Sequence, residues 1–177
     1  KVIFTSTATE AINLVLLGLE IPSNANIYIS PFEHNAVTRV LHHLQKSVTF
    51  NIEYLDVDKT DLSYNLKNIS TQFASNTPFC VIVSHASNVC GAVAPIKEIF
   101  TLAKNYSTIT IADMCQTAGL IDTDLSSDIY DYAIFEGHKT LYGSMGIGGL
   151  IAKPTIHLPP LIYGGTGVES ANQNMPD

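Results

Sequence analysis

The sequence has 177 residues, of which 46% are hydrophobic and 14% are charged. That balance excludes a disordered chain, and the length fits one domain with a substantial core. The formal net charge of −7 argues against a nucleic-acid partner, whose phosphates need clustered cationic side chains. No apolar stretch approaches the roughly 20 residues that a bilayer span needs, so we expect no membrane segment. The three cysteines (Cys80, Cys90 and Cys115) are too few and too scattered for a disulfide framework, and we expect reduced thiols in a cytoplasmic protein.

Segments of strand and helix pattern alternate along the chain. The expected strands are 1–5, 26–30, 49–56, 79–84, 108–112, 130–135 and 146–152, and the expected helices are 9–20, 33–45, 62–73 and 96–105. Residues 79–84 read FCVIVS, a continuous apolar run that is typical of a strand buried on both faces. This alternation predicts βαβ units and therefore a three-layer α/β/α fold with a mostly parallel, mixed sheet.

Both ends of the sequence predict a piece of a larger protein. We expect residues 1–153 to form one domain that is incomplete at its N-terminus, since the first strand begins at Lys1 itself. Residues 154–177 are rich in proline and glycine, and they predict an extended segment that leads toward a further, C-terminal domain.

Polar residues follow the carboxyl ends of several predicted strands, where ligands bind in sheets of this type. Lys139 lies just beyond strand 130–135, and a lysine there can form a Schiff base with an aldehyde if the pKa of its ammonium group is depressed. Most lysines are simply surface residues. Asp113 follows strand 108–112, where a carboxylate can pair with a protonated pyridine nitrogen or cap the next turn.

Other segments place complementary groups at the same edge. Residues 6–10 begin a helix, where backbone N–H groups bind an anion such as phosphate, or are simply capped. His34 also begins a helix, either as an imidazole that lies on an aromatic ring or as a polar first-turn residue. Asn88 and Gln116 are hydrogen-bond donors for a ring oxygen, or ordinary turn and surface residues. Together these groups match what one phosphorylated pyridine ring requires.

In this order the motifs resemble those of the class V aminotransferase family, especially its cysteine desulfurase and selenocysteine lyase branch. The similar segments run almost from end to end: FTSTATEAINLV, FEHNAV, SHASNVCGAVAPIKEI, ADMCQTAG, FEGHKTLYGSMGIGGL and LIYGGTGVES. The resemblance implies the large domain of a fold type I enzyme that depends on pyridoxal 5′-phosphate (PLP). It also implies that strand 146–152 is the antiparallel member of the sheet.

The resemblance implies a catalytic role for Lys139 and His34. Lys139 would form the Schiff base with PLP and move the α-proton of the substrate, and His34 would stack on the ring. Asp113 would pair with the ring nitrogen, while Asn88 and Gln116 would approach the ring oxygen or the substrate.

The phosphate would lie between two segments. Ala8, Thr9 and His138 would hold it, and Thr166 would reach the phosphate of a neighbouring subunit, which implies a homodimer. Two positions depart from the family pattern. Glu136 stands where the family usually has serine or threonine, and a carboxylate there repels phosphate unless it turns away or is neutralised. Thr7 stands where relatives often have glycine.

Two hypotheses about function follow. The first is a PLP-dependent enzyme that cleaves C–S or C–Se bonds in cysteine-type amino acids, or catalyses another class V reaction such as transamination. The second is a truncated or degenerate relative, a dimerising or structural module without catalysis. The persulfide-forming cysteine and the carboxylate-binding arginine of the desulfurase branch would lie beyond the C-terminal end of this sequence, and Arg39, in a predicted helix, is a poor substitute.

Two other kinds of site are set aside. Residues 143–149 match the dinucleotide pattern G-x-G-x-x-G poorly, and a strand rather than a helix follows them. The six histidines lack the spacing of common metal sites, so we expect no metal.

Overall fold

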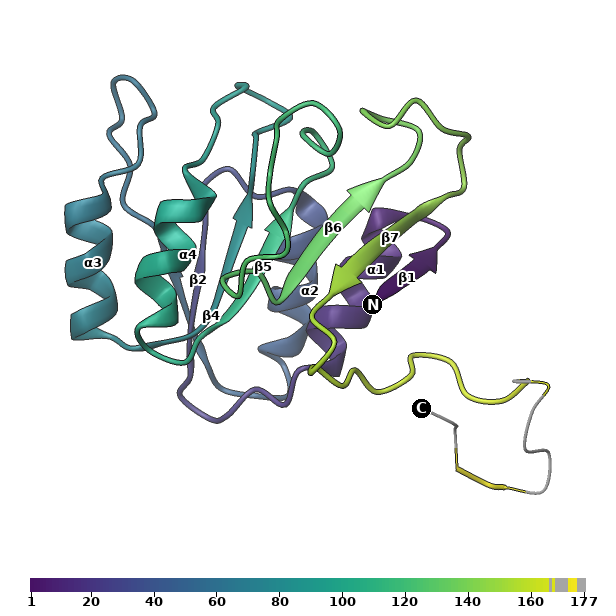
Figure 1. Cartoon of the computed structure of the whole chain (residues 1–177). Coiled ribbons are helices and arrows are strands. Elements are labelled where there is room, and N and C mark those ends of the chain that lie inside the picture. Colours follow the sequence, from purple (N-terminus) through teal and green to yellow (C-terminus); the bar gives the residue numbers. More distant parts are fainter. Residues whose placement is uncertain (166, 168–171, 175–177) are drawn as a thin grey trace.

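A computed structural model of the chain describes residues 1–165, 167 and 172–174 (Figure 1). Its strands form one seven-stranded sheet in the order β1-β7-β6-β5-β4-β2-β3. The strands are β1 (Val2–Thr5), β2 (Asn26–Ile29), β3 (Asn51–Tyr54), β4 (Pro78–Ser84), β5 (Ile109–Asp113), β6 (Tyr132–Glu136) and β7 (Gly148–Ala152). The helices are α1 (Ala8–Gly18), α2 (Asn35–Leu44), α3 (Leu66–Ser75) and α4 (Ile96–Lys104).

Every expected strand and helix is present, and the largest difference is the start of α3. The sequence predicts a helix from residue 62, whereas α3 begins at Leu66. Leu62 has a φ of 64°, outside the helical range, and Val57 pairs with Tyr64 in an isolated antiparallel bridge. Asn65 then caps the helix, because its side chain accepts a hydrogen bond from Asn68 N at 3.1 Å.

The sheet is mostly parallel, as predicted. Strand β4 pairs in parallel with both β2 and β5, and β5 pairs in parallel with β6. Strand β7 is antiparallel to both of its neighbours, β6 and β1. The expectation that residues 146–152 supply the antiparallel strand is therefore confirmed.

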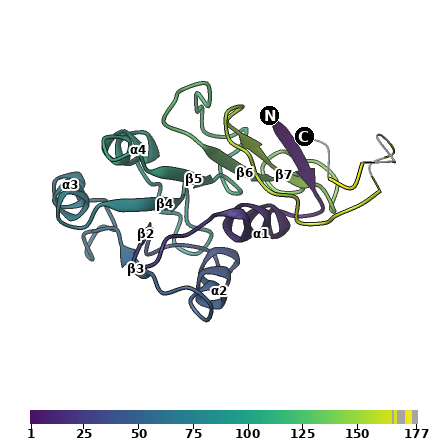
Figure 2. The same ribbon diagram turned by 90° about the horizontal axis from the view of Figure 1, so that it is seen from below.

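Helices cover both faces of the sheet, and α1 and α2 lie on the face opposite to α3 and α4 (Figure 2). Strand β4 shows why its sequence is continuously apolar. Cys80 and Ile82 belong to the core cluster under α1 and α2, whereas Val81 and Val83 belong to the cluster under α3 and α4. All four side chains are buried. This three-layer arrangement confirms the predicted fold class.

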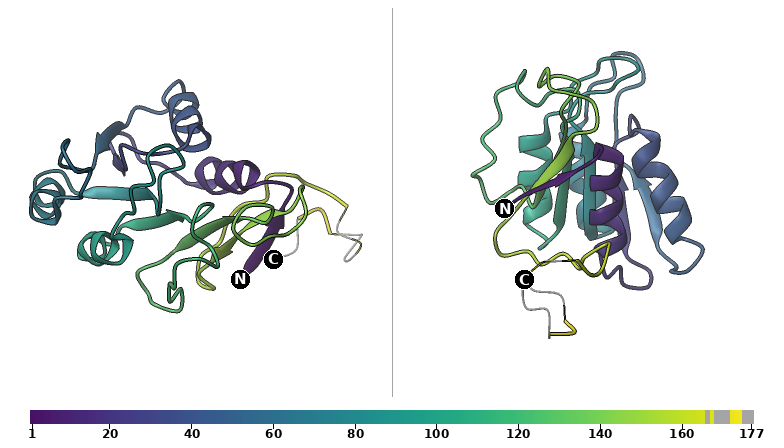
Figure 3. Two further views of the ribbon diagram at one scale, coloured as in Figure 1. Left: turned by 90° about the horizontal axis from the view of Figure 1, so that it is seen from above. Right: turned by 90° about the vertical axis from the view of Figure 1, so that its right-hand side faces the viewer.

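The chain after β7 runs away from the sheet (Figure 3). Its described residues form no helix or strand, although Ile156 and Leu158 pack against the core cluster under α1. The division into residues 1–153 and 154–177 stays a prediction. Among the helices that the structure describes, none has both the length and the apolar character needed to cross a bilayer.

Candidate active site

A small cavity of about 50 Å³ lies where the carboxyl ends of the central strands meet the starts of α1 and α2. Seven of the predicted site residues line it: Ala8, Thr9, His34, Asn88, Asp113, Gln116 and Lys139. His138 does not line this cavity, and Thr166 lies outside the described residues. The topology thus gathers residues from five separate segments, as expected when parallel strands end at one edge.

Asp113 ends β5 and is 7% exposed. It stands beside Ser84, its register partner at the end of β4. Its Oδ1 accepts a hydrogen bond from Cys115 N at 3.0 Å. Capping of the following turn and placement at the cavity, which the sequence left as alternatives, therefore occur together.

Lys139 follows β6 by three positions and is half-buried beside the cavity. Within the part of the chain that the structure describes, no hydrogen bond or ion pair engages its Nζ. An amine that is partly enclosed and unpaired is suited to react with an aldehyde.

His34 is the N-cap residue of α2, which is why this helix begins at Asn35 rather than at residue 33. Its Nδ1 accepts a hydrogen bond from Ala36 N at 3.1 Å. In the neutral ring, this bond assigns the proton to Nε2. The bond also holds the imidazole at the mouth of the cavity.

Glu33, which the sequence did not single out, binds Ser84, a residue that lines the cavity. Its carboxyl group accepts hydrogen bonds from Ser84 N at 2.6 Å and Ser84 Oγ at 2.9 Å, so it ties the start of α2 to the end of β4. Burial, with a further contribution from the charge of Asp113, raises the pKa of Glu33 to about 8. The only sequence signal for it was an acidic residue in a strand-to-helix turn.

The start of α1 is already occupied by carboxylates. Thr7 caps the helix, because Glu10 N donates to Thr7 Oγ1 at 3.2 Å, and the Glu10 side chain reaches back to accept from Ser6 N at 2.8 Å. Ala8 N donates to Glu136 Oε2 at 2.8 Å. Glu136 therefore points at the helix start instead of turning away from it, and it engages Ala8 N, one of the groups expected to hold the phosphate.

Two glycines at the ends of the loop between β6 and β7 allow close packing. A Cβ on Gly148 would lie 2.5 Å from Ala8 N, and one on Gly137 would lie 2.7 Å from Ile147 O. The loop leads into β7, as the sequence predicts. Because Gly148 has no side chain, the start of β7 packs directly against the backbone at the start of α1.

Cys115 lines the cavity but is not poised as a nucleophile. Burial, followed by the charge of Asp113, raises the pKa of the Cys115 thiol far above its ordinary value. It is held as a neutral thiol in the core cluster beneath α1 and α2.

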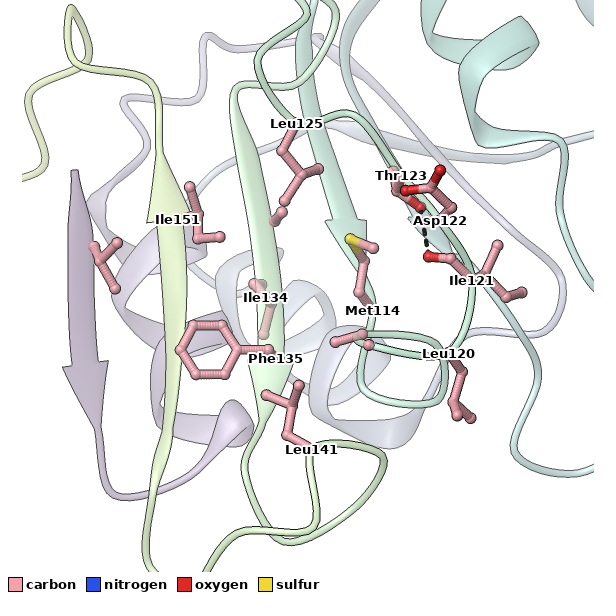
Figure 4. A pocket seen from close by; sticks show the side chains of 14 residues that line it. Met114, Leu120, Ile121, Asp122, Thr123, Leu125, Ile134, Phe135, Leu141 and Ile151 are labelled. Carbon is pink, nitrogen blue, oxygen red and sulfur yellow. Dashed lines mark hydrogen bonds between the residues drawn. The ribbon is translucent and has the colours of Figure 1, made fainter.

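A larger cavity of about 610 Å³ lies elsewhere and has a different character. Figure 4 shows Met114, Phe135 and Ile151 among the mostly apolar side chains around it. Its polar members include Thr123, whose Oγ1 donates to Ile121 O at 3.2 Å. None of the predicted site residues lines this cavity. In the described part of the chain, no cluster of three or more His, Cys, Asp or Glu residues is arranged to hold a metal ion.

The mixed sheet and the lysine site at its carboxyl edge define an α/β protein of the fold type I class. The sequence profile of the family Aminotransferase class-V matches residues 1–175, and the chain belongs to this family. It is 33% identical over 168 residues to a putative cysteine desulfurase, IscS 1, of Bacillus subtilis, covering 93% of this chain and 43% of that protein. It is 30% identical over 181 residues to cysteine desulfurase IscS 1 of Archaeoglobus fulgidus, covering 99% and 46% of the two chains.

Solved structures of similar fold include further proteins of this kind. A NifS-like protein superposes with a TM-score of 0.80 at 29% identity, over 93% of this chain and 45% of that one. The apo cysteine desulfurase of Thermococcus onnurineus also has a TM-score of 0.80, at 26% identity, over 86% and 38% of the chains. The chain spans less than half the length of these relatives.

Proposed function

We propose that this chain is the cofactor-binding part of a PLP-dependent enzyme that acts on amino acids, by cleavage of the C–S or C–Se bond of cysteine-type substrates. The observation that carries the proposal is the convergence of Lys139, Asp113 and His34 on one cavity. Membership of the class V family and the similarity to cysteine desulfurases support it.

The residues around the cavity suit the ring of PLP. Lys139 offers an unpaired amine, Asp113 a buried carboxylate and His34 an imidazole that is fixed by its bond to Ala36. When bound, PLP would supply an electron sink for the α-carbon of the amino acid. Lys139 Nζ would bind the aldehyde and take the α-proton, and Asp113 would keep a proton at the ring nitrogen.

Substrate would approach through a groove beside the cavity. This groove of about 430 Å³ lies between α1 and α2 and shares Thr9, His34 and Ala36 with the cavity. Asn88 and Gln116 line the cavity, where their amides would orient the ring or the substrate. The proposal also includes a cytoplasmic homodimer in which Thr166 reaches the neighbouring site.

A second candidate is a truncated or degenerate relative that serves as a dimerising or structural module without catalysis. The observation that favours it is the bond from Ala8 N to the Glu136 carboxylate, which occupies the expected phosphate position.

Absorbance spectroscopy after incubation with PLP and dialysis tests the cofactor binding that the enzyme proposal requires. The enzyme proposal expects a visible band that survives dialysis and is absent from the Lys139→Ala variant. A matched control, Lys67→Ala, changes an exposed lysine on α3 and should leave the band intact. A folded protein without a lysine-dependent band at any PLP concentration would favour the module.

A further inference from the structure

The phosphate end of the proposed cofactor site contains an unusual buried acid. Glu136 is 6% exposed and lines the same cavity as Lys139. One carboxylate oxygen accepts the bond from Ala8 N, and the other, Oε1, is buried and has no hydrogen-bond partner among the described residues. Oε1 lies 3.2 Å from His138 Nδ1, near enough for an ion pair when the imidazole is protonated but without hydrogen-bond geometry.

The surrounding backbone fixes this carboxylate in place. Glu136 is the last residue of β6, and its register partner in β7 is Gly148. Gly148 in turn lies against the backbone of Thr7 and Ala8 at the start of α1. Two strands and a helix therefore hold Glu136 where it satisfies an N–H group that a helix start offers to an anion.

A phosphate group would compete directly with this arrangement. It would need the N–H group of Ala8, which already donates to Glu136, and it would stand next to a negative charge in a buried place. The groups that suit the pyridine ring do not depend on the phosphate. Asp113 and His34 lie around the cavity on other elements and are placed by their own hydrogen bonds, and Lys139 lines the same cavity.

We propose that Glu136 is a built-in anion that takes the place of the cofactor phosphate at the start of α1, so that the site accepts an unphosphorylated pyridine aldehyde such as pyridoxal as readily as PLP. This inference rests on the proposed function, because it presupposes that Lys139 binds the aldehyde.

The test compares PLP and pyridoxal as probes of Lys139. The chain is incubated with a concentration series of each aldehyde and reduced with borohydride, and the adduct on Lys139 is quantified by mass spectrometry. The exposed Lys67 in the same chain serves as the reference for intrinsic reactivity, so the preference at Lys139 is expressed relative to it. The variants are Glu136→Ser, which removes charge and bulk, and the nearly isosteric Glu136→Gln, which removes charge alone. Glu98→Gln, in the first turn of α4, is the matched control.

In the unmodified chain, we expect PLP and pyridoxal to reach half-saturation of Lys139 at similar concentrations, once each is corrected for its reactivity with Lys67. Glu136→Ser should shift the preference toward PLP at least tenfold and Glu136→Gln in the same direction, while Glu98→Gln should change nothing. A tenfold preference for PLP in the unmodified chain, or an unchanged preference in Glu136→Ser, would overturn the inference and leave the proposed function standing. Absence of Lys139-specific labelling by either aldehyde in every variant would overturn both.

Discussion

Two buried carboxylates stand at the two ends of strand β6 and differ in their hydrogen-bond partners. Asp131, just before the strand, is 7% exposed, and its Oδ2 pairs with Lys104 and accepts hydrogen bonds from Thr110 N at 2.9 Å and Thr110 Oγ1 at 3.2 Å. Glu136, at the other end, is 6% exposed and has one oxygen without a hydrogen bond.

The difference separates a structural acid from one available for binding. A buried acid that pairs with a cation and accepts backbone and hydroxyl hydrogen bonds stabilises the fold where it stands. A buried acid with an unsatisfied oxygen beside a cavity keeps an uncompensated desolvation free energy. A ligand or a neighbouring cation can offset it by binding that oxygen. The amino end of β6 therefore belongs to the scaffold, and its carboxyl end belongs to the site.

The largest expected effect on stability comes from removing Asp131, the carboxylate at the amino end of β6. Asp131→Ala should lower the free energy of unfolding by about 3 kcal/mol, because it removes the acid that pairs with Lys104 and leaves Thr110 N without its acceptor. Chemical denaturation measures the loss. Asp128→Ala is the control, since it removes an exposed acid that pairs with Lys153, and it should leave stability nearly unchanged. Equal effects of the two changes would contradict the assignment of Asp131 to the scaffold.

At the carboxyl end of β6, beside the cavity, the packing of β7 against α1 can be disrupted by a substitution at Gly148. In Gly148→Ala, the added Cβ would meet backbone atoms of Thr7 and Ala8 at 2.5 Å, which cannot yield as a side chain does. We expect a loss of about 2 kcal/mol in unfolding free energy. Ser144→Ala, at an exposed position in the loop before β7, should change little by the same denaturation measurement. A Gly148→Ala variant as stable as the parent would show that β7 and α1 have room to separate.

The pH dependence of stability sharpens the comparison at a third carboxylate, Glu33. Its pKa is about 8 in the folded chain and near 4.5 when unfolded, so between these values only the folded state keeps the proton. The free energy of unfolding should therefore fall as pH rises from about 4.5 to about 8, with a contribution of at most about 1.4 kcal/mol per pH unit. Denaturation measured across this pH range should show that the free energy of unfolding of Glu33→Gln changes less steeply with pH than that of the unmodified chain. Glu10→Gln is the control: hydrogen bonds from Ser6 lower the pKa of Glu10, so it should leave the slope in this window unchanged.

The smallest expected effect is at Glu136 itself. Glu136→Gln should change the free energy of unfolding by less than about 1 kcal/mol, because the amide oxygen can still accept from Ala8 N and no fully satisfied charge is lost. The same denaturation experiment measures it beside Asp131→Ala. A loss as large as that of Asp131→Ala would place Glu136 with the scaffold.

Most of the fold and much of the candidate site follow from local patterns in the sequence. The run FCVIVS predicts a strand buried on both faces, and Cys80 and Val81 indeed enter different core clusters. Because parallel strands end at one edge, residues just beyond them, such as Asp113 and Lys139, could be expected to meet, and they line one cavity. The roles of these residues stay predictions.

The sequence by itself determined the alternation of strands and helices and the edge of the sheet where polar residues gather, since both depend on hydrophobic period and on turn residues close along the chain. Only the tertiary structure decided how the acids at that edge are satisfied. Glu33 binds Ser84 across 51 positions, and Glu136 binds Ala8 across 128. Such bonds depend on how β4, β6, α1 and α2 pack against one another, and no local pattern specifies where a side chain will find a partner so distant in the chain.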